Sequence, residues 1–292
     1  MDEKQKKKIE AVNARRIAKT KQERKHVLSQ KSGFYLKEAY RSLRTNIEFA
    51  MANTEGCKVV MVTSSVQSEG KSITALNLAI TFGQMEKKVL LIDADLRRPK
   101  QARLMNQNTA VGLSNLLMNP NQLDAAIVKS EEHGIDMIFA GDIPPNPAEL
   151  LASPKMKKLI ADLRERYEYV FVDTPPVDLV VDAVALSTQC DGVMYVVRAG
   201  QTERGAVLHG MEQLKYAGAN VLGFVFNGAT ADTVRGYGKY RYRKFAYYGR
   251  YGKYGKYGRY GHYGYRYGYS GYGYHSLHSD KPTNAENTEK DQ

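Results

Sequence analysis

The chain has 292 residues, 42% of them hydrophobic, and a formal net charge of +12 at pH 7. Its two cysteines argue against a disulfide framework and fit a reducing compartment, and its longest apolar runs are too short to span a bilayer. The excess positive charge lies at the two ends of the chain. We therefore expect a basic, flexible segment (residues 1–31), a globular domain (32–234) and a basic tail (235–292).

The N-terminal segment carries eleven Lys and Arg against four Asp and Glu. It is polar, weakly periodic and without the apolar core of a signal peptide. Either it is a solvated tail, or it contacts membrane headgroups, nucleic acid or an acidic partner. After it, apolar residues at three- and four-residue spacing predict an amphipathic helix over residues 34–52.

Short apolar runs then alternate with helical patterns up to about residue 232. We expect strands at 58–65, 87–95, 135–141, 167–176, 191–200 and 220–229, and helices at 71–85, 153–167, 178–189 and 203–217. Ser153 is the expected cap of the second of these helices, with Pro154 in its first turn. All-apolar strands that alternate with helices predict an α/β fold: a mainly parallel sheet with helices on both faces.

The stretch VTSSVQSEGKSI (62–73) lies between a predicted strand and a predicted helix. Its end, Gly70-Lys71-Ser72, is typical of a phosphate loop, in which backbone N–H groups and a lysine face phosphates and a hydroxyl ligates magnesium. The strict pattern requires glycine where this chain has Ser65. The alternative is a helix N-terminus without a ligand.

Three carboxylates follow predicted strands: Asp93 and Asp95 in VLLIDADLRRP, and Asp173 in YVFVDTPP. Any one of them alone could be a turn residue at the end of a strand. Ligands of parallel sheets bind at the carboxyl ends of the strands, so three carboxylates beside a phosphate loop favour a nucleotide–Mg²⁺ site.

Together these motifs resemble the Walker A, A′ and B set of bacterial tyrosine kinases (BY-kinases), which are P-loop NTPases of capsule and exopolysaccharide gene clusters. The resemblance covers about residues 33–232 and the tail. It includes PPNPAELLASPKM (144–156), VVRAGQTERGAV (196–207), and Glu38, Arg41 and Arg44 in EAYRSLRTNI, which match the family's oligomerisation helix. One departure is Ser68, where the family usually has glycine.

The resemblance implies a role for each motif residue. ATP would be bound by Ser68, Glu69, Gly70, Lys71, Ser72 and Ile73, with Asn227 at the purine and Arg198 as a weaker candidate near the site. Mg²⁺ would be held by Ser72, Asp95 and Asp173. Lys71 would neutralise the γ-phosphate, and Asp93 would accept the proton of the attacking tyrosine, whose ordinary pKa is about 10.

The tail from Tyr237 to Tyr274 holds 15 of the 21 tyrosines, with glycine, ten basic residues between 235 and 274, and no Val, Ile or Leu. This composition predicts disorder. We expect autophosphorylation in trans, within a ring held by the oligomerisation helix. The expected phosphoacceptors are Tyr248, Tyr251, Tyr254, Tyr257, Tyr260, Tyr263, Tyr265, Tyr267, Tyr269, Tyr272 and Tyr274.

The resemblance also implies partners: a membrane-embedded activator of the polysaccharide co-polymerase type, a phosphotyrosine phosphatase, and substrates such as glycosyltransferases or sugar-nucleotide dehydrogenases. The chain would then be cytoplasmic, peripheral at the membrane through that activator. Two alternative functions remain. A deviant-Walker ATPase that acts as a dimer switch would share the three motifs but has no evident use for the tail. A nucleic-acid-binding protein would share the Tyr/Gly/Arg composition of the tail. We expect no nucleic acid, because the nucleotide site is a better account of the whole chain.

Overall fold

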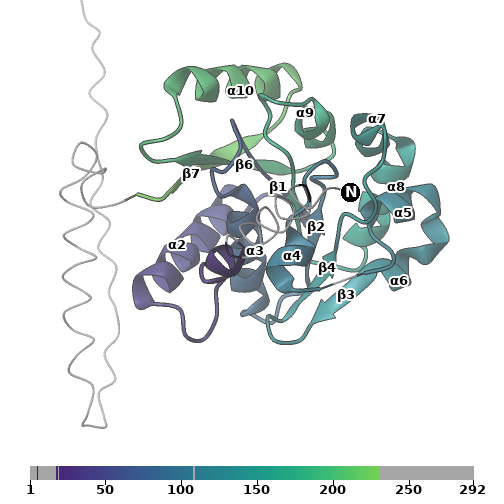
Figure 1. Ribbon diagram of the computed structural model, residues 1–292, viewed down its shortest axis with the longest axis horizontal. Helices are drawn as coiled ribbons and strands as arrows, with labels where there is room; N and C mark the ends of the chain where they lie inside the picture. The colour runs from purple at the N-terminus through teal and green to yellow at the C-terminus, as the bar shows by residue number, and fades with distance from the viewer. Residues whose placement is uncertain (1–4, 6–17, 19, 108, 230–292) are drawn as a thin grey trace, which may run out of the picture. The chain divides into compact units, whose positions relative to one another are not determined.

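The computed structural model describes residues 5, 18, 20–107 and 109–229. Its centre is one seven-stranded sheet with the order β3-β4-β2-β5-β1-β6-β7 (Figure 1). Strands β3 and β4 pair antiparallel, and every other neighbouring pair is parallel. The strands are β1 (Lys58–Ser64), β2 (Val89–Asp93), β3 (Ile127–Ser130), β4 (Ile135–Ile138), β5 (Tyr169–Asp173), β6 (Gly192–Arg198) and β7 (Val221–Asn227).

Helix α2 (Phe34–Ala50) precedes β1, and helices connect every later pair of successive strands except β3 and β4. The helices are α2, α3 (Lys71–Gly83), α4 (Gln101–Met105), α5 (Leu113–Met118), α6 (Leu123–Ala126), α7 (Pro147–Leu151), α8 (Pro154–Arg164), α9 (Asp182–Ser187) and α10 (Arg204–Tyr216), with a 3₁₀ turn at Pro120–Gln122. The expected cap of α8 is present, because the Ser153 hydroxyl accepts the N–H of Met156 at 3.2 Å. Pro154 occupies the first turn, where its missing N–H costs nothing.

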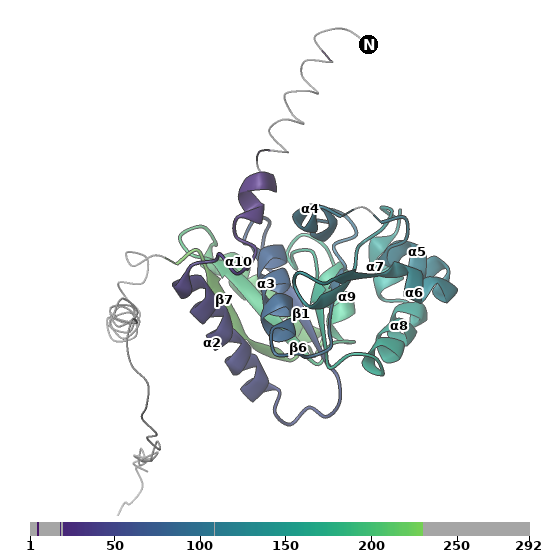
Figure 2. The ribbon, with the colours of Figure 1, turned by 90° about the horizontal axis from the view of Figure 1, so that it is seen from below.

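The core lies on both faces of the sheet because successive side chains of each strand point to opposite sides. Val60 and Val62 of β1 pack in the cluster that contains α3 and the buried residues of α2. Val59 packs on the other face against α5, α7 and α8, and Met61 on that face with Leu214 of α10. Figures 1 and 2 show α2 and α3 side by side along the sheet. The expected mainly parallel sheet with helices on both faces is confirmed.

All six predicted strands are present, and one further strand was not predicted. Strand β3 (IVKS) is short, antiparallel and half-exposed at the edge of the sheet, so it lacks the continuous apolar run of a buried parallel strand. The short helices α4 to α7 also have too few residues to show a helical period. Strand β5 and strand β2 are neighbours in register, which places Asp93 beside Asp173 at the carboxyl ends.

Residues 20–32, here called the N-terminal strap, pack against the same body. The Asn77 side chain of α3 accepts the N–H of Leu28 at 2.8 Å and donates to the carbonyl of His26 at 2.9 Å. Leu28 is 2% exposed, and Arg24 donates from Nε to the carbonyl of Arg103 at 3.0 Å. Within the expected basic segment, residues 24–28 are therefore held on the domain, mainly through Leu28 and Asn77.

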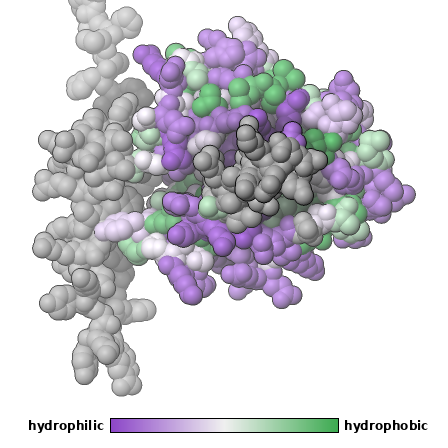
Figure 3. Space-filling model, viewed as in Figure 1, coloured by the Kyte–Doolittle hydropathy of each residue, from purple (hydrophilic) through white to green (hydrophobic). Residues whose placement is uncertain are grey.

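The chain divides into two units, residues 1–239 and 240–292, and every described residue belongs to the first. The expected tail, with its eleven candidate phosphoacceptors, lies outside the described residues. Cys57 and Cys190 are both free thiols. Hydrophilic residues predominate on the face in Figure 3. None of the helices in the described ranges has the length and apolarity to cross a membrane.

Candidate active site

The loop between β1 and α3 has the backbone geometry of a phosphate loop. Gly70 precedes α3 with φ +95°, in the left-handed region that favours glycine. Ser68 also has a positive φ, of +68°, which explains why the BY-kinase pattern has glycine at this position. Ser65 is not among the residues with positive φ, and its buried hydroxyl lies 2.9 Å from the hydroxyl of Tyr195. The strict pattern's glycine is therefore not required at residue 65.

Glu69 fixes this loop from within and from the neighbouring strands. Its carboxylate is fully buried, accepts the N–H of Val66 at 2.8 Å and is hydrogen-bonded to the hydroxyl of Thr202. Its carbonyl accepts the Asn227 side-chain amide at 2.7 Å. Thr202 lies in the family-like segment 196–207, but the sequence does not assign it to the phosphate loop, because only the fold brings the β6–α10 loop there.

Lys71 lies in a cluster of opposite charges at the start of α3. Its Nζ is 2.9 Å from Oδ2 of Asp95, 3.4 Å from Oδ1 of Asp173 and 3.4 Å from Oγ of Ser72. Burial by itself lowers the pKa of the Lys71 ammonium, but Asp173 and Asp95 outweigh burial and raise it above its usual value. Lys71 is therefore a permanent positive charge within the site.

The three carboxylates differ in access. Asp95 lines the cavity at 5% exposure, whereas Asp93 and Asp173 are fully buried. Asp93 accepts three backbone N–H groups, from Asp95 at 3.3 Å, Lys100 at 3.0 Å and Gln101 at 2.9 Å. Burial, and next the charge of Asp173, raise the pKa of Asp93 to about 7. Asp93 has the proton affinity of a base at neutral pH, but like Asp173 it is fully buried and does not line the cavity.

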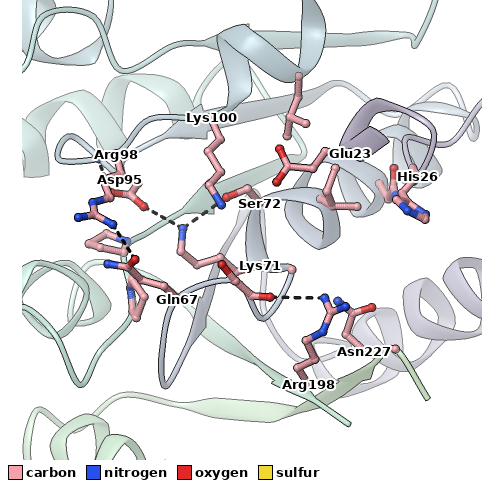
Figure 4. A pocket seen from close by; sticks show the side chains of 18 of the residues that line it. Glu23, His26, Gln67, Lys71, Ser72, Asp95, Arg98, Lys100, Arg198 and Asn227 are labelled. Carbon is pink, nitrogen blue, oxygen red and sulfur yellow. Dashed lines mark hydrogen bonds and ion pairs between the residues drawn. The ribbon is translucent and has the colours of Figure 1, made fainter. Parts of the chain in front are cut away.

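A cavity of about 820 Å³ lies over these groups. Figure 4 shows Lys71 directed toward Asp95 and Ser72, with Arg198 and Asn227 together at another part of the cavity. Arg198 donates to the carbonyl of Ser68 at 3.4 Å. Of the expected nucleotide-site residues, the cavity is lined by Ser68, Gly70, Lys71, Ser72, Ile73, Asp95, Arg198 and Asn227. Glu23 and His26, which lie in the N-terminal strap, also line this cavity and were not predicted.

The oxygen groups around Lys71 fit magnesium. Mg²⁺ prefers carboxylate and hydroxyl oxygens, usually keeps several waters, and takes one or two carboxylates together with substrate phosphates. Ser72, Asp95 and Asp173 supply such oxygens at the start of α3. Across the described ranges, no group of three or more His, Cys, Asp and Glu side chains could hold a metal alone. The set therefore suits an ion that arrives with nucleotide phosphates.

We expect the stability of the nucleotide-free protein to fall as the pH rises from about 6 to about 8. The pKa of Asp93 is about 7 in the folded chain against an ordinary 3.8, so the folded state binds this proton more tightly. Its contribution to stability is complete below pH 3.8 and is lost as the pH rises through about 7. Thermal unfolding at the two pH values measures this loss.

Asp93→Asn should reduce the slope of unfolding temperature against pH. Asp124→Asn is the matched control for the loss of a carboxyl group. Asp124 forms an exposed surface pair with Arg166 at 2.5 Å. An unchanged slope in Asp93→Asn would contradict the assignment of the raised pKa to this carboxyl.

The side chains of the three expected oligomerisation residues have different surroundings in the structure. Glu38 and Arg41 form an exposed ion pair at 2.6 Å on α2. Arg44 is half-buried and donates to the carbonyl of Thr81 near the end of α3 at 2.9 Å. Arg44 therefore ties α2 to the helix that begins with Lys71.

We expect Arg44→Ala to lower the free energy of unfolding by about 1.5–3 kcal/mol, since it removes a charged hydrogen-bond donor from a half-buried carbonyl. Arg41→Ala should change it by less than about 1 kcal/mol, because exposed pairs contribute little. Urea unfolding of both variants measures the difference. Equal losses would contradict the inward role of Arg44.

The comparisons with known proteins agree with this geometry. A sequence model described as an AAA domain matches residues 57–219. The tyrosine-protein kinase YwqD of Bacillus subtilis is 42% identical over 203 residues, which are 70% of this chain and 85% of that protein. The kinase domain of the Escherichia coli tyrosine kinase ETK has a TM-score of 0.63 at 35% identity, over 67% of this chain and 78% of that chain.

A more distant structure, the cobyrinic acid a,c-diamide synthase of Mycobacterium smegmatis, contains an ATP analogue and magnesium. It has a TM-score of 0.51 at 18% identity, over 61% of this chain and 78% of that chain, so this likeness shows the P-loop NTPase fold alone. The similarity to YwqD covers most of that kinase, and the sequence motifs indicated the same family. The chain therefore belongs to the bacterial tyrosine-protein kinases, the BY-kinases, and is a protein-tyrosine kinase.

Proposed function

We propose that the chain transfers the γ-phosphoryl group of Mg-ATP to tyrosines of its own C-terminal cluster, in trans, and regulates capsule or exopolysaccharide synthesis in this way. The observation that supports the proposal most is the convergence of Lys71, Asp95 and Asp173 within 3.4 Å at the start of a phosphate-loop helix. Phosphoryl transfer depends mainly on positioning and on neutralising charge, which is what such a cluster provides.

In this proposal the phosphates lie along the backbone from Ser68 to Ile73, and Lys71 leaves its carboxylate partners to meet them. Magnesium, when bound, would supply positive charge beside the phosphates. Ser72, Asp95 and Asp173 orient that ion. Asn227 contacts the purine base in this proposal. Its Nδ2 donates to the Glu69 carbonyl, and its Oδ1 can accept a hydrogen bond from a purine amino group.

Asp93 stays our proposed proton acceptor. Its pKa of about 7 leaves about half of the carboxyl ionised at neutral pH, which suits a base for a phenol. Because Asp93 is fully buried, a tyrosine can reach it only if the loop that carries Asp95 and Lys100 moves aside. Asp95, on the cavity wall, is the carboxylate that an entering tyrosine meets first.

The tail composition supports its role as the acceptor. Residues 235–274 carry ten Lys and Arg and no acid, so they are attracted to a triphosphate and to the acidic strand ends. Each added phosphate brings about −1.5 to −2 charges, and about six would cancel the positive charge. We propose that this change in charge weakens a ring in which Glu38 and Arg41 face a neighbouring copy. We also propose that residues 1–31 dock on a membrane-embedded activator.

A mixing experiment tests transfer in trans. One chain carries Lys71→Met with all tail tyrosines intact, and the other has an intact active site with its 15 tail tyrosines changed to phenylalanine. We expect mass spectrometry to find phosphotyrosine on the Lys71→Met tail only when the second chain, Mg²⁺ and ATP are all present. An unmodified tail in the complete mixture, beside a wild-type chain that modifies itself, would show transfer within one chain and contradict the proposal.

A further inference from the structure

Gln101, the first residue of α4, contacts all three motifs of the site. Its backbone N–H donates to Oδ2 of Asp93 at 2.9 Å. Its side-chain amide donates to Oδ2 of Asp173 at 2.9 Å and to the carbonyl of Ser72 at 3.0 Å. One residue thus joins the ends of β2 and β5 to the first turn of α3.

The two contacts to carboxylates have an electrostatic consequence. Asp93 and Asp173 are register partners on neighbouring strands, and both are fully buried. Gln101 gives each of them an N–H donor without adding a charge. A lysine at this position would compete with Mg²⁺, and an apolar residue would leave Oδ2 of Asp173 without this donor. The amide therefore fixes one oxygen of Asp173 while Oδ1 stays directed at Lys71.

The rest of the Gln101 side chain argues against a purely structural role. Gln101 is fully buried, and no group in the described part of the chain donates to its Oε1. A buried polar atom without a partner is unfavourable to folding, so a residue chosen only for packing would be apolar here. Unsatisfied polar groups are tolerated at functional sites. Because Gln189 also has a buried Oε1 without a partner, it is the contacts with Asp173 and Ser72 that set Gln101 apart.

We propose that Gln101 is a positioning residue that orients Asp173 and the backbone of Ser72 for the metal–nucleotide complex. The inference rests on the proposed Mg-ATP site and goes beyond it, because it assigns the orientation of the metal ligands to a residue outside the three motifs. Groups that orient metal ligands typically change metal affinity or activity by about 10–100-fold when they are replaced.

Gln189 provides a matched control. Like Gln101, it is a glutamine whose amide donates to a backbone carbonyl, that of Leu151, at 2.9 Å, and whose Oε1 is buried without a partner. Gln189 as a whole is partly buried, whereas Gln101 is fully buried. It lies at the end of α9 and contacts none of the site residues named above. Gln101→Met and Gln189→Met thus remove the same chemical group from two places, of which only one touches Asp173.

The experiment measures binding of Mn²⁺, as a probe for Mg²⁺, to the full chain with an unreactive ATP analogue, by electron paramagnetic resonance of the free ion. We expect the half-saturating Mn²⁺ concentration to rise about tenfold or more in Gln101→Met, and to stay at the wild-type value in Gln189→Met. Gln101→Leu is the second variant and should show the same weakening. Thermal unfolding of each variant confirms that it is folded.

Wild-type Mn²⁺ binding in a folded Gln101→Met would overturn the inference, as would equal weakening in Gln189→Met. Unfolding of both Gln101 variants would show a structural role and overturn it too. A wild-type chain that binds no metal–nucleotide complex at all would instead contradict the proposed function, so the two failures are distinguishable.

Discussion

Replacing Lys71 by methionine is expected to reduce phosphorylation of the tail at least about 10²–10³-fold, because the site loses the charge that would face the γ-phosphate. Lys71 is the only described residue whose ammonium lies within 3.4 Å of both Asp95 and Asp173. Mass spectrometry of the tail after incubation with Mg-ATP measures the loss. Unaltered phosphorylation would remove Lys71 from the mechanism.

The same substitution should also make stability depend more on pH. In the wild-type chain burial raises the pKa of Asp173, and Lys71 is the main group that opposes this rise. Without Lys71 the pKa of Asp173 rises further, so more stability is lost as the pH increases to about 8. We expect Lys71→Met to unfold at a lower temperature than wild type at about pH 8, with a smaller difference at about pH 5.

Lys87→Met is the matched control for both measurements. Lys87 pairs with Glu168 at 2.7 Å, but both side chains are exposed to solvent. An exposed ion pair contributes at most about 1 kcal/mol, so this variant should keep full phosphorylation and the wild-type pH profile. A similar loss of activity in Lys87→Met would mean that removal of any lysine disturbs the enzyme.

The parts of the fold that could be predicted are those with a local cause. Strands such as KVVMVTS and YVFVD are continuous apolar runs, because a parallel strand is buried on both faces. Strand β3 could not be found in this way, since Ile127 and Val128 are only partly buried and pair antiparallel at the edge. The N-terminal strap was also missed, because Leu28 is held by Asn77, a residue 49 positions away.

The candidate site divides in the same way. Gly70, Lys71 and Ser72 form a contiguous motif, and the two Asp motifs follow buried strands. These site residues could therefore be predicted from the sequence pattern. Gln101 and Thr202 bond to Asp173 and Glu69, which are distant in sequence, so no sequence pattern assigned either of them to the site. Arg44 shows what a motif leaves open: the motif groups it with Glu38 and Arg41, and its side chain turns inward to Thr81. Side-chain direction on a helix depends on what packs beside it.

The second large effect is expected for Gly70→Ala, which should weaken Mg–nucleotide binding by about 100-fold. A Cβ at residue 70 would lie 2.0 Å from Nδ2 of Asn227, and φ at Gly70 is +95°. A left-handed backbone costs an L-residue about 1–2 kcal/mol, and relief of the clash would require the Asn227 side chain to turn away from its hydrogen bond to the Glu69 carbonyl. Either change displaces the N–H groups that start α3 and would face the phosphates. Titration with a fluorescent ADP analogue and Mg²⁺ measures the affinity.

Three further variants separate the clash with Asn227 from the unfavourable φ at residue 70 and from the added methyl group. The double variant Gly70→Ala/Asn227→Ala removes the clash but keeps the unfavourable φ, so it should bind more tightly than Gly70→Ala and less tightly than Asn227→Ala alone. Gly205→Ala is the control for the added methyl group, because Gly205 lies in α10 with no atom within 4 Å of the new Cβ. It should bind nucleotide as the wild type does, since alanine is favourable in a helix. Wild-type affinity in Gly70→Ala would contradict the site, because a phosphate loop that tolerates a side chain at this glycine does not need the left-handed turn that brings its N–H groups to the phosphates.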